Sequence, residues 1–167
     1  GKVGLALSCR DDNAGQVEHS GLYYLETRDF GRTWMGLPNS KLSIPLDRPD
    51  NPAMVREYGR NSQFPPYSRT MGGPLVLYLL RHVKQPVPRR DTRIWSTAKW
   101  VGREWEATGV LTSDHDYDSG CIAVERLVWW LIAPTQPGAQ PLASGGDLVS
   151  WRTETYGRSW YPQALTT

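Results

Sequence analysis

The sequence predicts an all-β fold, and three observations support this class. No long segment carries apolar residues at helical spacing behind a capping signal. Short runs rich in β-branched and aromatic residues recur instead, separated by clusters of Gly, Pro, Asp and Asn. Groups of such runs return about every 50 to 65 residues. The chain is therefore expected to repeat one β-sheet unit.

The expected strands follow in three groups along the chain. They span 3–8, 22–27, 33–35 and 54–57, then 74–83, 93–97 and 103–106, and finally 121–124, 127–132, 147–151 and 158–160. The near-continuous apolar runs around Leu77 and Trp130 are typical of strands buried on both faces. We therefore expect three stacked units at about 1–58, 59–112 and 113–167, each an antiparallel sheet of about four strands. This is the organisation of a partial β-propeller, whose first blade lacks its innermost strand.

Composition excludes several classes of partner. The 167 residues carry a net charge of +2, from 19 Lys and Arg against 17 Asp and Glu, which is too small a surplus to indicate nucleic-acid binding. The longest strongly apolar run, 127–133, is far shorter than the roughly 18 residues of a membrane span. Cys9 and Cys121 lack zinc-site spacing, and we expect two buried free thiols, with a disulfide as the alternative in an exported protein.

Two octapeptides make the repeat concrete. Residues 27–34 read T-x-D-x-G-x-T-W, and residues 153–160 read T-x-T-x-G-x-S-W. In the first copy the Asp is expected to accept hydrogen bonds from backbone N–H groups, and the Gly is expected to adopt a positive φ. The Thr hydroxyl is expected to hold the far side of the turn, and the Trp is expected to return to the apolar layer. The residues with these structural roles are Thr27, Asp29, Gly31, Thr33 and Trp34, and Thr153, Gly157, Ser159 and Trp160. Asp29 is therefore expected to stabilise a turn and not to act as a catalytic acid.

The octapeptide resembles the Asp box of the bacterial neuraminidase repeat proteins, which are β-propellers. The order of the segments Gly1–Lys2–Val3, Cys9–Arg10–Asp11, 21–24, 42–46, 61–63, 73–76 and 145–149 is similar to that of one subgroup. That subgroup contains ulvan lyases, rhamnose–glucuronate lyases and some propeller rhamnosidases. The resemblance implies a seven-bladed parent protein, of which this chain is a C-terminal segment.

The same resemblance implies a secreted or periplasmic enzyme that cleaves rhamnose–uronate polysaccharides by β-elimination, with no cofactor. In such lyases a His or Tyr removes the proton α to the uronate carboxylate, while an Arg neutralises that carboxylate. The catalytic Tyr, Arg and His residues of the family are expected upstream of this chain, so no catalytic residue is assigned. A propeller glycoside hydrolase, such as a rhamnosidase or sialidase-like enzyme, is one alternative. A non-catalytic glycan-binding or scaffold propeller is the other.

Five residues are candidates for sugar binding in the central funnel of the propeller. Arg10 ends an apolar strand and is suited to clamp a carboxylate, with a solvated strand-end arginine as the alternative. Asn61, Gln63 and Tyr67 stand where an inner strand begins, and they either bond sugar hydroxyls or cap loop backbone. His19 occupies a position that is often polar in the resembled family, with a surface bystander as the alternative. Trp34, Trp105 and Trp160 are expected to pack between blades.

Two further expectations concern metals and partners. Asp114, Asp116, Asp118 and Glu125 have the alternating spacing of a calcium loop, but the sixth position is Ser119 where glycine is required. A solvated connection between blades is the preferred interpretation. Three blades do not close a ring of four to eight, so two apolar blade faces are expected to be covered by further blades or by self-association.

Overall fold

The computed structural model describes residues 1–11, 18–58, 62–63, 67–70, 73–81, 93–113, 119–135 and 146–166. Every regular element among these residues is a β-strand, and every strand pairing is antiparallel. The described part of the chain contains no helix with the length and apolar character needed to cross a membrane. The all-β class predicted from the sequence is confirmed.

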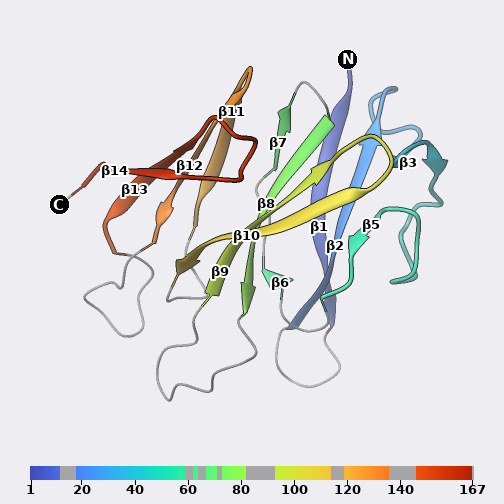
Figure 1. Ribbon diagram of the computed structural model, residues 1–167. Coiled ribbons are helices and arrows are strands. Elements are labelled where there is room, and N and C mark those ends of the chain that lie inside the picture. Colours follow the sequence, from blue (N-terminus) through green and yellow to red (C-terminus); the bar gives the residue numbers. More distant parts are fainter. Residues whose placement is uncertain are drawn as a thin grey trace.

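The strands form three open sheets that lie side by side (Figure 1). Sheet 1 contains β1 (Val3–Asp11), β2 (Glu18–Thr27), β3 (Met35–Gly36), β4 (Ser40–Lys41) and β5 (Met54–Arg56). Sheet 2 contains β6 (Ser62–Gln63), β7 (Tyr67–Thr70), β8 (Gly73–Arg81), β9 (Arg93–Trp100) and β10 (Trp105–Ser113). Sheet 3 contains β11 (Cys121–Glu125), β12 (Val128–Pro134), β13 (Leu148–Thr153) and β14 (Tyr161–Ala164). Each sheet is thus built from one continuous stretch of the chain.

Sheet 2 is covered on both faces, because successive residues of β8 point to opposite sides. Leu75, Leu77 and Leu79 join the cluster shared with sheet 3, whereas Val76 and Tyr78 join the cluster shared with sheet 1. All five side chains are buried. This alternation explains why the sequence of β8 is continuously apolar, and the expectation of a strand buried on both faces is confirmed for it.

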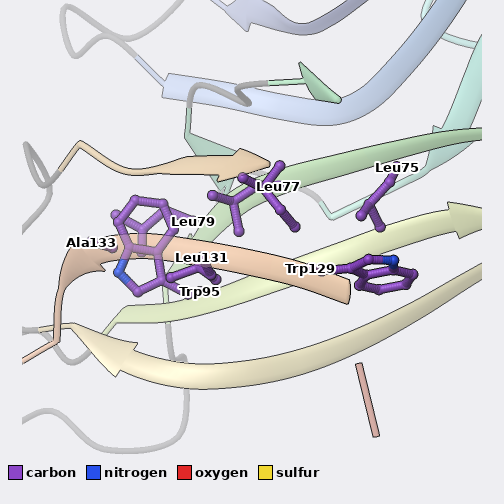
Figure 2. Packing of buried hydrophobic residues seen from close by; sticks show 8 residues of the cluster. Leu75, Leu77, Leu79, Trp95, Trp129, Leu131 and Ala133 are labelled. Atoms are coloured by element: carbon purple, nitrogen blue, oxygen red, sulfur yellow. The ribbon is translucent and has the colours of Figure 1, made fainter. Parts of the chain in front are cut away.

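The interface between sheets 2 and 3 is the larger of two cores that join neighbouring sheets. Figure 2 shows side chains of β8 and β9 gathered against those of β12. Its buried members are Leu75, Leu77, Leu79, Trp95, Ile122, Trp129, Leu131 and Ala133. Trp95 also donates a hydrogen bond from Nε1 to the carbonyl oxygen of Pro134 at 3.2 Å, so one side chain of sheet 2 bonds directly to the backbone of sheet 3.

The interface between sheets 1 and 2 is more aromatic. Leu22 and Tyr24 of β2 meet Val76, Tyr78 and Ala98 of sheet 2. Trp105, at the start of β10, packs at its edge with its ring centroid 5.5 Å from that of Tyr24. Tyr58, which follows β5, hydrogen-bonds the hydroxyl of Tyr78, and burial raises the pKa of the Tyr78 phenol. Both hydroxyls therefore stay protonated at physiological pH.

The outer face of sheet 1 is covered in part by the segment 37–53. Leu42 and Ala53 of that segment pack on Tyr23 and Leu25 of β2, and Trp34 joins the same cluster. The prediction that Trp34 packs between blades is therefore wrong, because a loop of its own unit fills the space next to it. Trp105 and Trp160, in contrast, do lie at interfaces between sheets.

Three other expectations need correction. The run around Trp130 is buried on one face only, since Trp129 and Leu131 face sheet 2 while Trp130 is half-buried on the outer side. The last strand begins at Tyr161, because residues 158–160 belong to the turn before it. Cys121 is a free thiol as expected, but it is exposed, because it lies on the outer side of sheet 3.

The sheets meet along one set of edges. β7, at an edge of sheet 2, contacts both β1 of sheet 1 and β11 of sheet 3. β1 and β11 are themselves edge strands of their sheets. The three sheets therefore converge at β1, β7 and β11, and the chain runs outward from these strands within each sheet.

Candidate functional site

The turn at residues 27–34 is held by one carboxylate and two hydroxyls. Asp29 Oδ1 accepts the backbone N–H of Thr33 at 2.8 Å, and Oδ2 accepts the Thr33 hydroxyl at 2.7 Å. Thr27 Oγ1 accepts the N–H of Gly31 at 2.9 Å and donates to Asp29 Oδ1 at 2.8 Å. Gly31 has a φ of 87°. The local bonds use both carboxylate oxygens of Asp29, as expected for a residue that stabilises a turn.

The turn at residues 153–160 repeats this arrangement without the carboxylate. The hydroxyl of Thr155 accepts the N–H of Ser159 at 2.9 Å and bonds the Ser159 hydroxyl at 2.9 Å. Thr153 Oγ1 accepts the N–H of Gly157 at 3.2 Å, in the same way as Thr27 in the first turn. The two central φ angles also match, at 56° and 86° here and at 58° and 87° in the first turn. The two turns therefore occupy equivalent positions in their sheets.

The carboxylate of the first turn makes the stability of the chain depend on pH. The Thr33 hydroxyl, followed by the Thr33 N–H, holds the pKa of Asp29 below its ordinary value of 3.8. Because the pKa of Asp29 is lower in the folded state than in the unfolded state, its ionised carboxylate stabilises the fold at pH values above the unfolded-state pKa. This contribution is lost as the pH falls through the folded-state pKa. Asp29→Thr, which copies Thr155, is expected to fold and to lose less thermal stability than the unchanged chain below about pH 4.

The measurement is the melting temperature between pH 3 and pH 7. Thr155→Asp is the reciprocal variant, and its melting temperature is expected to fall more steeply at low pH than that of the unchanged chain. The same fall in melting temperature at low pH in all three proteins would show that the Asp29 bonds do not contribute to stability.

A groove of about 530 Å³ lies where the second turn meets sheet 2. Its walls come from β9, β10, β13 and the turn, and include Lys99, Glu106, Leu111, Trp151, Tyr156 and Arg158. The second turn carries Tyr156 and Arg158 at its two variable positions beside Gly157. The hydrogen bonds of the turn thus place an aromatic ring and a cation at the edge of sheet 2.

Lys99 is the cation that enters the groove from sheet 2. Its Nζ lies 4.6 Å from the ring centroid of Tyr156 and 5.6 Å from that of Trp129. Aromatic faces attract cations, so these two rings hold the ammonium group in the groove. Glu106 is the cross-strand partner of Lys99 in the β9–β10 register. With exposed Arg158, the described groove contains two cations and one carboxylate.

The aromatic rings of the groove supply apolar contact area. Trp151 and Trp160 are half-buried. Their indole N–H groups donate to Thr135 Oγ1 and to the carbonyl of Gly157, both at 3.1 Å, which holds the rings in place. Positioned rings beside two cations can stack on the C–H face of a sugar and pair with its carboxylate. This combination of side chains suits an acidic sugar.

The groove is suited to binding more than to proton transfer. General acid–base catalysis needs two positioned groups that exchange protons near neutral pH. Among the groove residues that the structure describes, Glu106 and Tyr156 are exposed to solvent and none is a histidine. No group of three or more His, Cys, Asp or Glu side chains suited to a metal ion occurs in the described part of the chain.

The register of sheet 1 brings two of the predicted binding residues together. Arg10 in β1 and His19 in β2 are directly opposite one another in the antiparallel pairing. This pairing follows an irregularity between Leu7 and Cys9, which shifts the register by one residue in this end of the hairpin. Arg10, the predicted carboxylate clamp, and His19, a predicted sugar-binding residue, therefore occupy neighbouring positions on the two strands.

The other predicted binding residues lie along one edge of sheet 2. Gln63 in β6 pairs with Leu79, and Tyr67 in β7 pairs with Val76. Both residues therefore lie beside β8. Their partners on β8 are three residues apart, which corresponds to roughly 10 Å along the strand. Asn61 and the possible calcium ligands Asp114, Asp116 and Asp118 are outside the described residues.

The groove itself was not predicted from the sequence. Lys99 and Arg158 come from different sheets, and only the packing of sheets 2 and 3 brings them together. One signal was present: both octapeptides contain an aromatic residue, Gly and Arg in succession, at residues 30–32 and 156–158. The repeated aromatic–cation pair at a turn tip marks a surface that can contact a ligand or a neighbouring sheet.

The chain matches no protein-family model and no curated protein.

Proposed function

We propose that this chain is part of a secreted or periplasmic β-propeller that acts on rhamnose–uronate polysaccharides, and that the groove between sheets 2 and 3 binds a uronate of the polymer. The observation that carries the proposal is the placement of Lys99 and Arg158 beside the rings of Trp151, Tyr156 and Trp160. Sugar C–H faces stack on such rings, and the carboxylate of a uronate pairs with the two cations. A neutral polymer would use only the aromatic part of this surface.

The chemistry we propose for the complete protein is β-elimination. This reaction needs a cation at the uronate carboxylate and a base at the α-proton. The register pairing of Arg10 with His19 supports a second uronate contact near the strands where the three sheets converge. The resemblance of the turns to the Asp box supports the same class of enzyme.

A non-catalytic glycan-binding propeller is the second candidate. It is favoured by the described groove residues, which supply cations and rings beside an exposed carboxylate, an arrangement suited to holding an acidic sugar. The two candidates differ in product and not in binding. A lyase forms an unsaturated uronate that absorbs in the ultraviolet, whereas a binding protein leaves the polymer intact.

The proposal is tested by calorimetric titration of the 167-residue chain with a uronate-containing oligosaccharide and with a neutral one of equal length. We expect Lys99→Gln combined with Arg158→Gln to weaken binding of the uronate ligand at least about tenfold, which corresponds to roughly 1.4 kcal/mol. Binding of the neutral ligand is expected to change little. Arg103→Gln, which removes an exposed cation in the β9–β10 turn, is the matched control.

Equal affinity of the double variant and the unchanged chain would contradict a uronate site in the groove. Ultraviolet absorbance of the polymer incubated with the complete protein separates the two candidates. An increase with time favours the lyase, and tight binding without any increase favours the binding protein.

A further inference from the structure

Three cross-strand pairs of β9 and β10 face sheet 3 beside the groove. They are Lys99 with Glu106, Thr97 with Thr108, and Trp95 with Leu111. The two members of such a pair point to the same side of the sheet, and successive pairs stand about 7 Å apart along β9. The floor of the groove thus extends over about 13 Å, from Lys99 to the level of Leu111. This length exceeds one sugar ring, so a bound polymer places more than one sugar on the floor.

The charged side chains of the described groove gather at the level of Lys99. Glu106 is directly opposite Lys99 in the register. The ring centroid of Tyr156 lies 4.6 Å from Lys99 Nζ, and Arg158 follows two residues later in the same tight turn. Two cations and one carboxylate leave a surplus of one positive charge at this level. One uronate carboxylate neutralises that surplus.

Lys99 and Glu106 present separate charges to a ligand. Among the described residues no ion pair joins them, although cross-strand partners of opposite charge are close enough to form one. The ammonium group of Lys99 lies over the rings of Tyr156 and Trp129 instead. Glu106 is exposed to solvent and lines the groove. Its carboxylate therefore acts on whatever the groove holds next to Lys99.

The described groove residues at the next two levels carry no charge. Thr108 is exposed, Leu111 and Trp151 are half-buried, and all three line the groove. A ligand carboxylate at the level of Thr108 would stand about 7 Å from Glu106, within the Debye length of roughly 8 Å at physiological salt. Glu106 would repel that carboxylate, and no described cation lines this part of the groove. A neutral sugar avoids the repulsion and can contact the Thr108 hydroxyl and the Trp151 ring.

We propose that the groove binds one uronate with a neutral sugar beside it, and that Glu106 rejects an acidic sugar in the second position. This inference rests on the proposed uronate site and adds the order of sugars that the site prefers. Lys99 and Arg158 supply the attraction to the uronate. Discrimination against the wrong ligand also uses repulsion, which Glu106 supplies. Polymers that alternate acidic and neutral sugars are therefore favoured over runs of consecutive uronates.

The test compares two oligosaccharides of equal length by calorimetric titration of the 167-residue chain. One ligand alternates uronate and neutral sugars, and the other is an oligogalacturonate with consecutive uronates. The measured quantity is the ratio of the two affinities. Glu106→Gln keeps the size and the hydrogen-bonding capacity of the side chain but removes its charge. It is expected to shift the ratio toward the oligogalacturonate by about threefold, a typical effect for one exposed charge.

Two further measurements identify the cause of that shift. Thr108→Lys places a cation at the second level and is expected to shift the ratio in the same direction, although Glu106 is unchanged. The shift caused by Glu106→Gln is expected to shrink as salt is added, because the exposed carboxylate is screened. A change in packing alone would not depend on salt in this way.

Glu104→Gln is the matched control, because Glu104 is an exposed carboxylate in the β9–β10 turn and does not line the groove. It removes the same net charge from the chain and is expected to leave the ratio unchanged. An unchanged ratio in both Glu106→Gln and Thr108→Lys, or an equal shift in Glu104→Gln, would overturn the role of Glu106 while the uronate site stands. Binding of neither ligand by the unchanged chain would overturn the uronate site and this inference together.

Discussion

Replacing Trp95 by alanine is expected to lower the free energy of unfolding by about 3–5 kcal/mol. Trp95 is 1% exposed and lies in the core between sheets 2 and 3, next to Leu79 and Ala133 (Figure 2). The substitution leaves a cavity in that core and removes the hydrogen bond to the carbonyl of Pro134. A domain of this size is stable by only about 5–15 kcal/mol, so the loss is a large share of the total.

Chemical denaturation gives the magnitude, and two controls identify its origin. Trp95→Phe keeps a ring in the core but lacks the N–H donor, and it is expected to cost about 1–3 kcal/mol. Leu127→Ala changes an exposed side chain and is expected to stay within about 0.5 kcal/mol of the unchanged chain. If Trp95→Ala behaved like Leu127→Ala, sheets 2 and 3 would not share the core described above.

The turns were predictable from the sequence because all of their determinants lie within eight residues. Asp29 and Thr33 are four positions apart, and no other part of the chain is needed to bring them together. The same holds for Thr155 and Ser159. A threonine replaces the carboxylate in the second turn because its hydroxyl can accept the same backbone N–H. Local chemistry of this kind can be read directly from sequence.

The burial of each strand was harder to predict, because it depends on what lies next to the sheet. The sequences of β8 and β12 are both continuously apolar, yet only β8 has a sheet on each side. A run of apolar residues shows that a strand can be buried on both faces, and it does not show whether a neighbour is present. For the same reason Cys121 was expected to be buried and is exposed.

The candidate binding site depends on contacts between distant segments. Lys99 and Tyr156 are brought together by the packing of sheets 2 and 3, and no local pattern encodes that distance. The pairing of Arg10 with His19 depends on the irregularity after Leu7, which a sequence pattern does not locate. Residue types could therefore be proposed from the sequence, whereas their grouping required the fold.

Gly36→Ala is expected to destabilise the chain by about 1–3 kcal/mol through overpacking. Gly36 is buried in β3, and a Cβ at this position would collide with the backbone carbonyl of Pro52. A backbone atom cannot move aside as a flexible side chain can. The methyl group is therefore expected to push the segment 37–53 away from sheet 1.

The segment has little freedom to adjust, because hydrogen bonds hold it on both sides of Pro52. The N–H of Tyr24 donates to the carbonyl of Ala53 at 2.8 Å, and the Tyr23 hydroxyl donates to the carbonyl of Pro49 at 3.0 Å. The side chain of Asn51 adds a third restraint, since its Oδ1 accepts the N–H of Ala53 at 2.9 Å. Displacement of the segment would break the two bonds to Tyr23 and Tyr24 of β2 and uncover Tyr23.

Limited proteolysis within 37–53, together with the melting temperature, measures this effect. Gly109→Ala is the control, because the added methyl group would meet Ile94 Cγ2 at 3.2 Å and no backbone atom within 4 Å. A side-chain methyl group can shift by the few tenths of an ångström required, so the control is expected to retain most of its stability. Faster cleavage in Gly36→Ala alone would show that the close contact between β3 and Pro52 keeps segment 37–53 on sheet 1. Equal cleavage in both variants would exclude this role of the contact.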